Sequence, residues 1–170
     1  LEAVQRAGGI AFIAHPVDPP SAAFHQPDLS RVDWDVEGYA GIEIWNFGSE
    51  FKSHLRSVPT GLYYAFNLAE SSVAPLRESL ALWDRLLEQG RRVIAFAGAD
   101  AHGTQVNLGP LHGQILPYEF LFRAVNLHLL TDQPVSGDAD ADRRLLFDAL
   151  RRGRCFVGHD LPAPTRGFHF

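Results

Sequence analysis

Asp100 and His102 stand two positions apart in the segment Gly98-Ala-Asp-Ala-His-Gly103. In an extended segment both side chains project to the same side, so a carboxylate oxygen and an imidazole nitrogen can reach one cation. His15 can supply a third donor from a separate part of the chain. With nitrogen and oxygen donors and no thiolate, the pattern predicts Zn, Mn or Fe rather than a cysteine-held structural zinc.

Glu43 is the acidic residue of a second candidate segment, Gly41-Ile-Glu-Ile-Trp45, which ends on Asn46. Ile42 and Ile44 are expected to share one face of a strand, with Glu43 and Trp45 on the other. A carboxylate inside a buried strand needs a partner, so Glu43 is either a metal ligand or the partner of an arginine. We therefore expect catalysis from Asp100, His102 and Glu43.

Substrate contacts are expected from side chains that can line the mouth of the site. The candidates are Asn46, His25 and His112, although loop histidines are more often simply exposed. Two loops, from Pro16 to Gly38 and from Gly103 to Pro117, are predicted to shape the pocket, because long irregular loops in compact domains are often functional.

The elements that must position these residues are short apolar strands alternating with helices. Strands are predicted at residues 10–14, 41–45, 93–97 and 154–158. An amphipathic helix is predicted at residues 73–89, and a second helix, acidic at its start and basic at its end, at residues 140–152; each is followed by glycine. The stretch 118–130 is ambiguous between helix and strand. This alternation is typical of α/β folds. His15, Asn46 and Asp100 each follow a strand, and the carboxyl ends of such strands are where ligand groups collect.

Composition excludes several classes of protein. The chain has 170 residues, 46% hydrophobic, with a formal net charge of −5, which argues against nucleic acid as a partner. One cysteine cannot form an internal disulfide, and no apolar run approaches the roughly 18 residues of a membrane span. No phosphate-binding glycine loop, dinucleotide fingerprint or nucleophile elbow is present in the sequence. We expect a single cytoplasmic domain over residues 1–170 that acts on a small molecule.

Three motifs resemble, in order, the later motifs of the PHP (polymerase and histidinol phosphatase) superfamily: residues 8–16, residues 41–46 and residues 98–103. The last part, residues 146–167, looks like the branch of the CehA/McbA-like metallohydrolases. This resemblance implies a distorted (β/α)7 TIM-like barrel and up to three divalent metals that activate water for phosphoester, ester or carbamate hydrolysis. It also places His15, Asp100 and His102 on metal-ligand positions and Glu43 on a characteristic acidic position.

The sequence departs from that family at its expected first strand. The PHP pattern opens with a His-x-His pair, and this chain contains none. Together with the missing methionine, this favours a chain that carries only the later strands of a barrel, with a divergent complete protein as the alternative. The function expected is a metal-dependent hydrolase. A non-catalytic partner-binding module and a nuclease of the same superfamily remain as alternatives.

Overall fold

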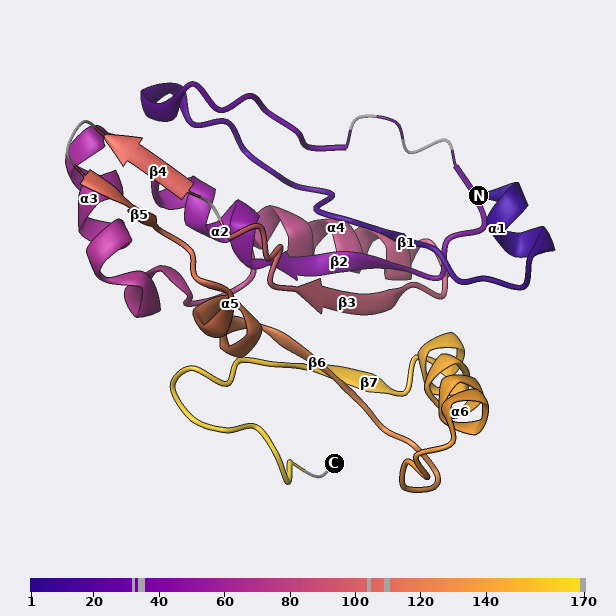
Figure 1. Ribbon diagram of the computed structural model, residues 1–170. Helices are drawn as coiled ribbons and strands as arrows, with labels where there is room; N and C mark the ends of the chain where they lie inside the picture. The colour runs from indigo at the N-terminus through magenta and orange to yellow at the C-terminus, as the bar shows by residue number, and fades with distance from the viewer. Residues whose placement is uncertain (32, 34–35, 104, 109–110, 169–170) are drawn as a thin grey trace.

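The computed structural model describes residues 1–31, 33, 36–103, 105–108 and 111–168, with the backbone alone at 106–108 and 111–112. Its centre is a parallel sheet of three strands in the order β1 (Phe12–Ile13), β2 (Gly41–Asn46) and β3 (Ile94–Gly98). Figure 1 shows this sheet with α4 (Arg77–Glu88) beside it and the segment that leads from β1 to β2 crossing above. Among the described residues, no helix has both the length and the apolar character that a membrane crossing requires.

The rest of the sheet structure is antiparallel. Two ribbons are formed, β4 (Gln105–Leu108) with β5 (Leu111–Gln114), and β6 (Asn126–Leu129) with β7 (Cys155–Gly158). The expected barrel is therefore wrong: the described strands form separate sheets of three, two and two, and close no barrel. The physical reason lies after β3, where the chain folds back on itself as a ribbon and does not cross over to another parallel strand.

The helices follow the capping signals of the sequence. Helix α6 (Ala139–Arg152) ends at Gly153, whose backbone is in the left-handed conformation. The Asp138 side chain caps the first turn of this helix by accepting from the N–H of Ala141. Helix α4 is confirmed but begins four residues later than its apolar spacing predicts. The ambiguous stretch divides into α5 (Tyr118–Ala124) and β6. Two further helices, α2 (Phe47–His54) and α3 (Val58–Phe66), follow β2.

The remaining short elements are helical turns: α1 (Glu2–Arg6), and the 3₁₀ turns η1 (Ala22–Phe24) and η2 (Leu68–Ser71). The η1 turn lies inside the predicted long loop and is seen at the upper left of Figure 1. That loop is therefore largely irregular, as expected from its proline-rich sequence.

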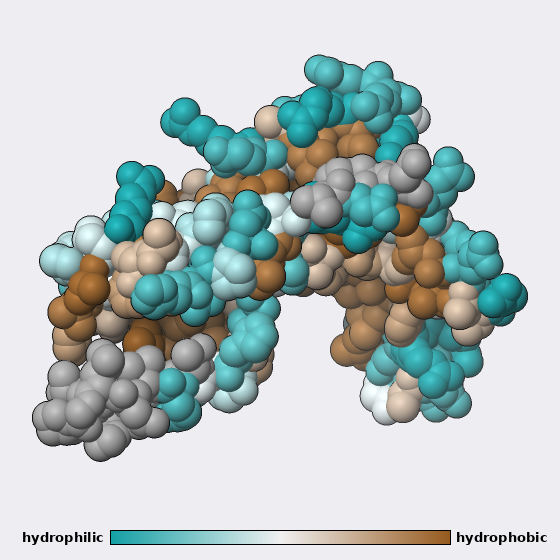
Figure 2. Space-filling model, turned by 90° about the horizontal axis from the view of Figure 1, so that it is seen from above, coloured by the Kyte–Doolittle hydropathy of each residue, from teal (hydrophilic) through white to brown (hydrophobic). Residues whose placement is uncertain are grey.

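Two hydrophobic clusters cover the opposite faces of β2. Ile42 and Ile44 belong to one, together with Leu86 of α4, while Trp45 belongs to the other, together with Leu121 of α5. The predicted alternation of β2 is confirmed by this division. Seen from above, the molecule is hollowed between two lobes, and apolar residues reach the surface in several places (Figure 2). Phe66 and Phe122 are among the large apolar side chains that are exposed.

Candidate functional site

The carboxyl edge of the parallel sheet carries most of the predicted site residues. His15 follows β1 by two positions, Asn46 ends β2, and Asp100 follows β3 by two positions. Because the three strands are parallel, these ends lie along one edge of the sheet. We call His15, Glu43, Asn46, Asp100 and His102 the sheet-edge cluster.

Glu43 is the centre of this cluster. Its side chain is buried, and its Oε2 accepts from the backbone N–H of His15 at 2.7 Å and from the Asn46 amide at 3.0 Å. Oε1 faces Gly98, where a Cβ would lie 2.6 Å from it. Glycine at position 98 therefore lets the carboxylate approach the neighbouring strand.

Burial raises the pKa of the Glu43 carboxyl above its ordinary value. The hydrogen bonds from His15 and Asn46 oppose this rise, while the negative charge of Asp100 adds to it. No described arginine bonds or pairs with Glu43, so the alternative of an arginine partner finds no support among the described residues. A carboxyl with a raised pKa in such a position is suited to proton transfer.

His15 presents an unsatisfied polar atom at the same place. Its Nδ1 is buried and has no hydrogen-bond partner among the described residues. The residue also has a φ of 29°, in a region that side-chain-bearing residues rarely adopt. A buried nitrogen that lacks a hydrogen bond and a strained backbone each lower the stability of the folded state. Such features are concentrated at functional sites.

Asp100 shares this backbone strain, with a φ of 51°. A Cβ on Gly48 would lie only 2.4 Å from Oδ2 of Asp100. Glycine at position 48 is therefore required for the carboxylate to reach the end of β2. The irregularity in the register of β2 and β3, between Glu43 and Trp45, lies beside the same residues. Irregularities of this kind re-aim side chains and are frequent next to active sites.

His102 turns toward Asp100 and toward solvent. Its Nδ1 lies 2.7 Å from the backbone oxygen of Asp100 and 3.3 Å from Oδ1 of the same residue. Both atoms accept hydrogen bonds, so Nδ1 is the donor to them, and in the neutral ring Nε2 carries the lone pair. The side chain is 70% exposed, which leaves Nε2 accessible to a ligand.

The donor types fit a divalent metal, but their arrangement fits it incompletely. Among the described residues, no group of three His, Cys, Asp or Glu side chains is placed to hold one ion together. The expected convergence of His15, Asp100 and His102 on a single point is thus not seen in this arrangement. The cluster instead offers two pairs, His15 with Glu43 and Asp100 with His102.

The three residues expected to contact substrate have different positions. Asn46 is committed to structure, because its amide donates to Glu43 and its Oδ1 caps α2 by accepting from the N–H of Ser49. His25 is exposed in the loop at the end of η1, with a φ of 52°. The side chain of His112 lies outside the described residues.

Three charged residues on α2 or bound to it were missed by sequence reasoning. Lys52 of α2 pairs with Asp18 at 3.1 Å, and both side chains are nearly buried. Glu50, also buried, accepts from the Trp45 indole at 2.7 Å and from the backbone N–H groups of Val73 and Ala74. The partners are 5 to 34 positions apart, and without knowledge of α2 no sequence pattern connects them.

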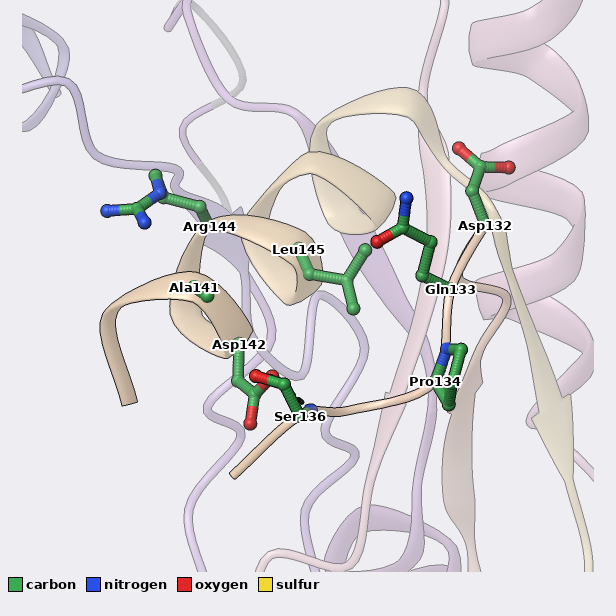
Figure 3. A pocket seen from close by; sticks show the side chains of 8 residues that line it. All are labelled: Asp132, Gln133, Pro134, Ser136, Ala141, Asp142, Arg144 and Leu145. Carbon is green, nitrogen blue, oxygen red and sulfur yellow. Dashed lines mark hydrogen bonds between the residues drawn. The ribbon is translucent and has the colours of Figure 1, made fainter. Parts of the chain in front are cut away.

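A pocket of about 400 Å³ lies away from the sheet-edge cluster, between the first turns of α6 and the segment before this helix (Figure 3). Figure 3 shows Asp142 beside Ser136, while Arg144 extends away from Asp132. The Asp142 carboxylate accepts from the backbone and hydroxyl of Ser136 and from the N–H of Gly137. These bonds explain Asp142 as a structural residue that closes the turn before α6.

Comparison with protein-family models, with curated proteins and with solved structures finds no match for this chain.

Proposed function

We propose that the sheet-edge cluster belongs to a metal-dependent hydrolase that acts on a phosphoester or a related ester or carbamate. The observation that carries the proposal is the buried, unpartnered Nδ1 of His15, a residue whose backbone N–H donates to the buried Glu43. Folding alone does not favour such an atom, whereas a ligand would satisfy it. The motifs that resemble the PHP superfamily are the same segments that meet at this edge.

The donor atoms that this edge offers to a metal are Nδ1 of His15, a carboxylate oxygen of Asp100 and Nε2 of His102, and in this arrangement they do not converge on one point. When bound, a divalent ion supplies a water whose pKa is lowered toward neutrality. The chain contributes the orientation of these donors. The hydrogen bond from Nδ1 of His102 to the Asp100 backbone fixes the ring and its tautomer, as outer partners of metal-binding histidines commonly do.

Glu43 is suited to hold the proton of the reaction. Its Oε2 accepts two N–H donors, so a proton on this carboxyl resides on Oε1. Burial raises the pKa of this carboxyl, which favours its protonated form relative to an exposed glutamate and is the property that a general acid requires. In this proposal Asn46 is a positioning residue that holds the Glu43 carboxyl.

The experiment measures metal binding and hydrolysis together. Equilibrium dialysis with Mn²⁺ or Zn²⁺ is expected to show saturable binding, and the loaded protein is expected to release p-nitrophenol from p-nitrophenyl phosphate. The variant His102→Ala is expected to lose at least tenfold in metal affinity, because the exposed Nε2 is removed without disturbing packed groups. Gln89→Ala, at an exposed site after α4, is the control.

The non-catalytic module is the second candidate, and it is favoured by the lack of a three-ligand group among the described residues. It predicts no saturable metal binding and no turnover under the same conditions. Binding without turnover, lost in His102→Ala, would retain the metal site but reject the hydrolase.

A further inference from the structure

A cavity of about 290 Å³ lies at the beginning of β3, at the end of this strand opposite to the sheet-edge cluster. Residues of α4, of the end of α6 and of the beginning of β7 complete its wall, and Figure 1 shows α6 on the same side of the molecule as the beginning of β3. A strand rises by about 3.3 Å per residue, so Ile94 in the cavity wall is about 13 Å from Gly98 at the far end of β3. A ligand held here is therefore separate from the sheet-edge cluster.

Part of the cavity wall is apolar. Trp83 of α4 and Cys155 of β7 contribute to it, together with Val93 and Ile94 at the beginning of β3. The indole N–H of Trp83 donates to the backbone oxygen of Val93 at 2.9 Å, which fixes the position of the ring. A fixed aromatic ring beside aliphatic side chains offers a preformed surface for an apolar or aromatic group, since little side-chain freedom is lost on binding.

The charged part of the wall is positive. The lining residues, every one of them described, include Arg92 and Arg152 and no acidic side chain. Both arginines are exposed, so their guanidinium groups are accessible to a ligand that enters from solvent. An anion is therefore the charge that this cavity attracts, although the chain as a whole has a formal net charge of −5.

The fold uses only part of the hydrogen-bonding capacity of these two arginines. Arg92 donates from Nη2 to the backbone oxygen of Arg152 at 2.7 Å, and no described carboxylate forms an ion pair with Arg92. Arg152 donates from Nε to Asp148, and its terminal nitrogens form no bond with a described residue. Positive charge at the end of α6 complements the helix dipole, but this effect does not require a cavity beside the two guanidinium groups.

We propose that this cavity binds a small organic anion, an aromatic carboxylate, with its ring against Trp83 and its charge held by Arg92 and Arg152. Guanidinium groups match a planar carboxylate, because two parallel N–H groups can donate to its two oxygens. The volume lies just below the range of roughly 300–1,000 Å³ of larger small-molecule sites, which suits a ligand with a single ring. This site does not depend on the proposed hydrolase.

Titration calorimetry of the metal-free protein with benzoate is the first test. Benzoate is expected to bind saturably, with one site per chain. Benzamide has nearly the same shape but no charge, and acetate has the charge but no ring. Each of the two is expected to bind at least tenfold more weakly than benzoate, because each satisfies only one part of the wall.

Two arginine variants locate the anion. Arg152→Gln is expected to weaken benzoate binding at least fivefold and, because the side chain is exposed, to leave the circular dichroism spectrum unchanged. Arg143→Gln is the matched control. Arg143 is also exposed on α6 and also pairs with an aspartate, Asp140 at 2.8 Å, but it does not line the cavity. It is expected to leave the affinity for benzoate within twofold of the original.

Alkylation of Cys155 gives an independent measurement. The chain has one cysteine, and it lines this cavity, so the rate at which iodoacetamide adds to the protein reports on this place alone. Burial raises the pKa of the Cys155 thiol, so the rate is measured at pH 9 by mass spectrometry. Saturating benzoate is expected to slow the alkylation at least fivefold, and benzamide at the same concentration less than twofold.

Four results would overturn the proposal. Equal affinity for benzoate and benzamide would mean that the arginines do not hold the anion. Equal losses in Arg152→Gln and Arg143→Gln would mean attraction by surface charge in general. Binding that is lost in His102→Ala would place benzoate at the sheet-edge cluster, and alkylation of Cys155 that benzoate does not slow would place it elsewhere. None of these measurements needs a metal or turnover, so a failure of the hydrolase proposal leaves their results unchanged.

Discussion

Two clusters of polar residues in this molecule hold a carboxylate in opposite ways. In the sheet-edge cluster, burial raises the pKa of Glu43 and leaves the Nδ1 of His15 without a partner among the described residues. At the end of the β6–β7 ribbon, burial also acts to raise the pKa of Asp160, but bonds from Thr165 and Asn126 outweigh it, and the pKa is lowered. Burial therefore decides the direction of the pKa shift at the first carboxyl, and hydrogen bonding decides it at the second.

The second cluster, which we call the ribbon cluster, consists of Asn126, His128, Asp160 and Thr165. The Asp160 carboxylate accepts from the backbone N–H and hydroxyl of Thr165 at 2.6 Å each, and from the Asn126 amide at 2.9 Å. The ring of His128 lies 2.8 Å from the Thr165 hydroxyl and stacks on Phe156. Each of these four residues has a partner, so the ribbon cluster is explained by structure: it holds the segment after β7 against the ribbon.

Polar groups with all their hydrogen bonds and polar groups that lack one therefore have different consequences within this one protein. A fully bonded network contributes stability and specifies one arrangement. A network that lacks some of its hydrogen bonds lowers stability, and such a network is retained where activity requires it. The comparison therefore predicts that variants of the two clusters separate activity from stability.

The largest expected effect is on activity, in Asp100→Asn. Removing the charge while keeping the shape is expected to lower kcat/KM for p-nitrophenyl phosphate by about 100-fold, or about 2.7 kcal/mol in transition-state stabilisation. The urea midpoint is expected to change little, because Asp100 is only partly buried. Asp84→Asn, at an exposed site of α4, is the matched control. Loss of activity in proportion to lost folded protein would contradict the comparison.

The next effect is on stability, in Asp160→Asn. One carboxylate oxygen becomes an NH₂ group that faces N–H or O–H donors of Thr165 or Asn126, so a bond is lost and a donor is left unsatisfied. The free energy of unfolding is expected to fall by about 1–3 kcal/mol. Urea denaturation at pH 7 measures this fall. The activity of the folded fraction is expected to stay within threefold of the original, and a larger loss would place the ribbon cluster in the functional site.

The pH dependence of that fall has a definite sign. Because the folded-state pKa of Asp160 lies below its unfolded value, the folded state binds fewer protons through this group. Its contribution to stability is present above the unfolded pKa of about 4 and is lost as pH falls through the lowered folded pKa. The difference in unfolding free energy between the original and Asp160→Asn is expected to shrink below about pH 4. A difference independent of pH would contradict this account.

Sequence reasoning succeeded where one local signal decides the structure. Alternation of Ile42 and Ile44 against Trp45 predicted both faces of β2, and the glycine at 153 predicted the end of α6. The same reasoning brought His15, Asn46 and Asp100 to the ends of strands, since parallel strands with a polar residue after each are readable without tertiary information.

It failed where the structure depends on distant partners. The barrel was an implication of the family resemblance, and nothing local distinguishes the paired strands at residues 105–108 and 111–114 from a loop. Helices α2 and α3 are eight and nine residues long, too short for a strong apolar period. The pairing of Lys52 with Asp18 joins α2 to a loop 34 positions earlier, so this ion pair was not predictable from the sequence.

The smallest expected effect, and the sharpest test of the comparison, is that of Glu43→Gln on stability in the metal-free protein. For a carboxyl whose folded pKa is raised, the folded state binds more protons, so stability is lost as pH rises through the folded pKa. Glutamine carries no charge to bury, and its oxygen can accept both the His15 N–H and the Asn46 amide. We therefore expect the unfolding free energy at pH 7 to be unchanged within about 0.5 kcal/mol or to increase. The free energy of unfolding is measured by urea denaturation. If it falls in Glu43→Gln as much as in Asp160→Asn, Glu43 is a structural residue like Asp160.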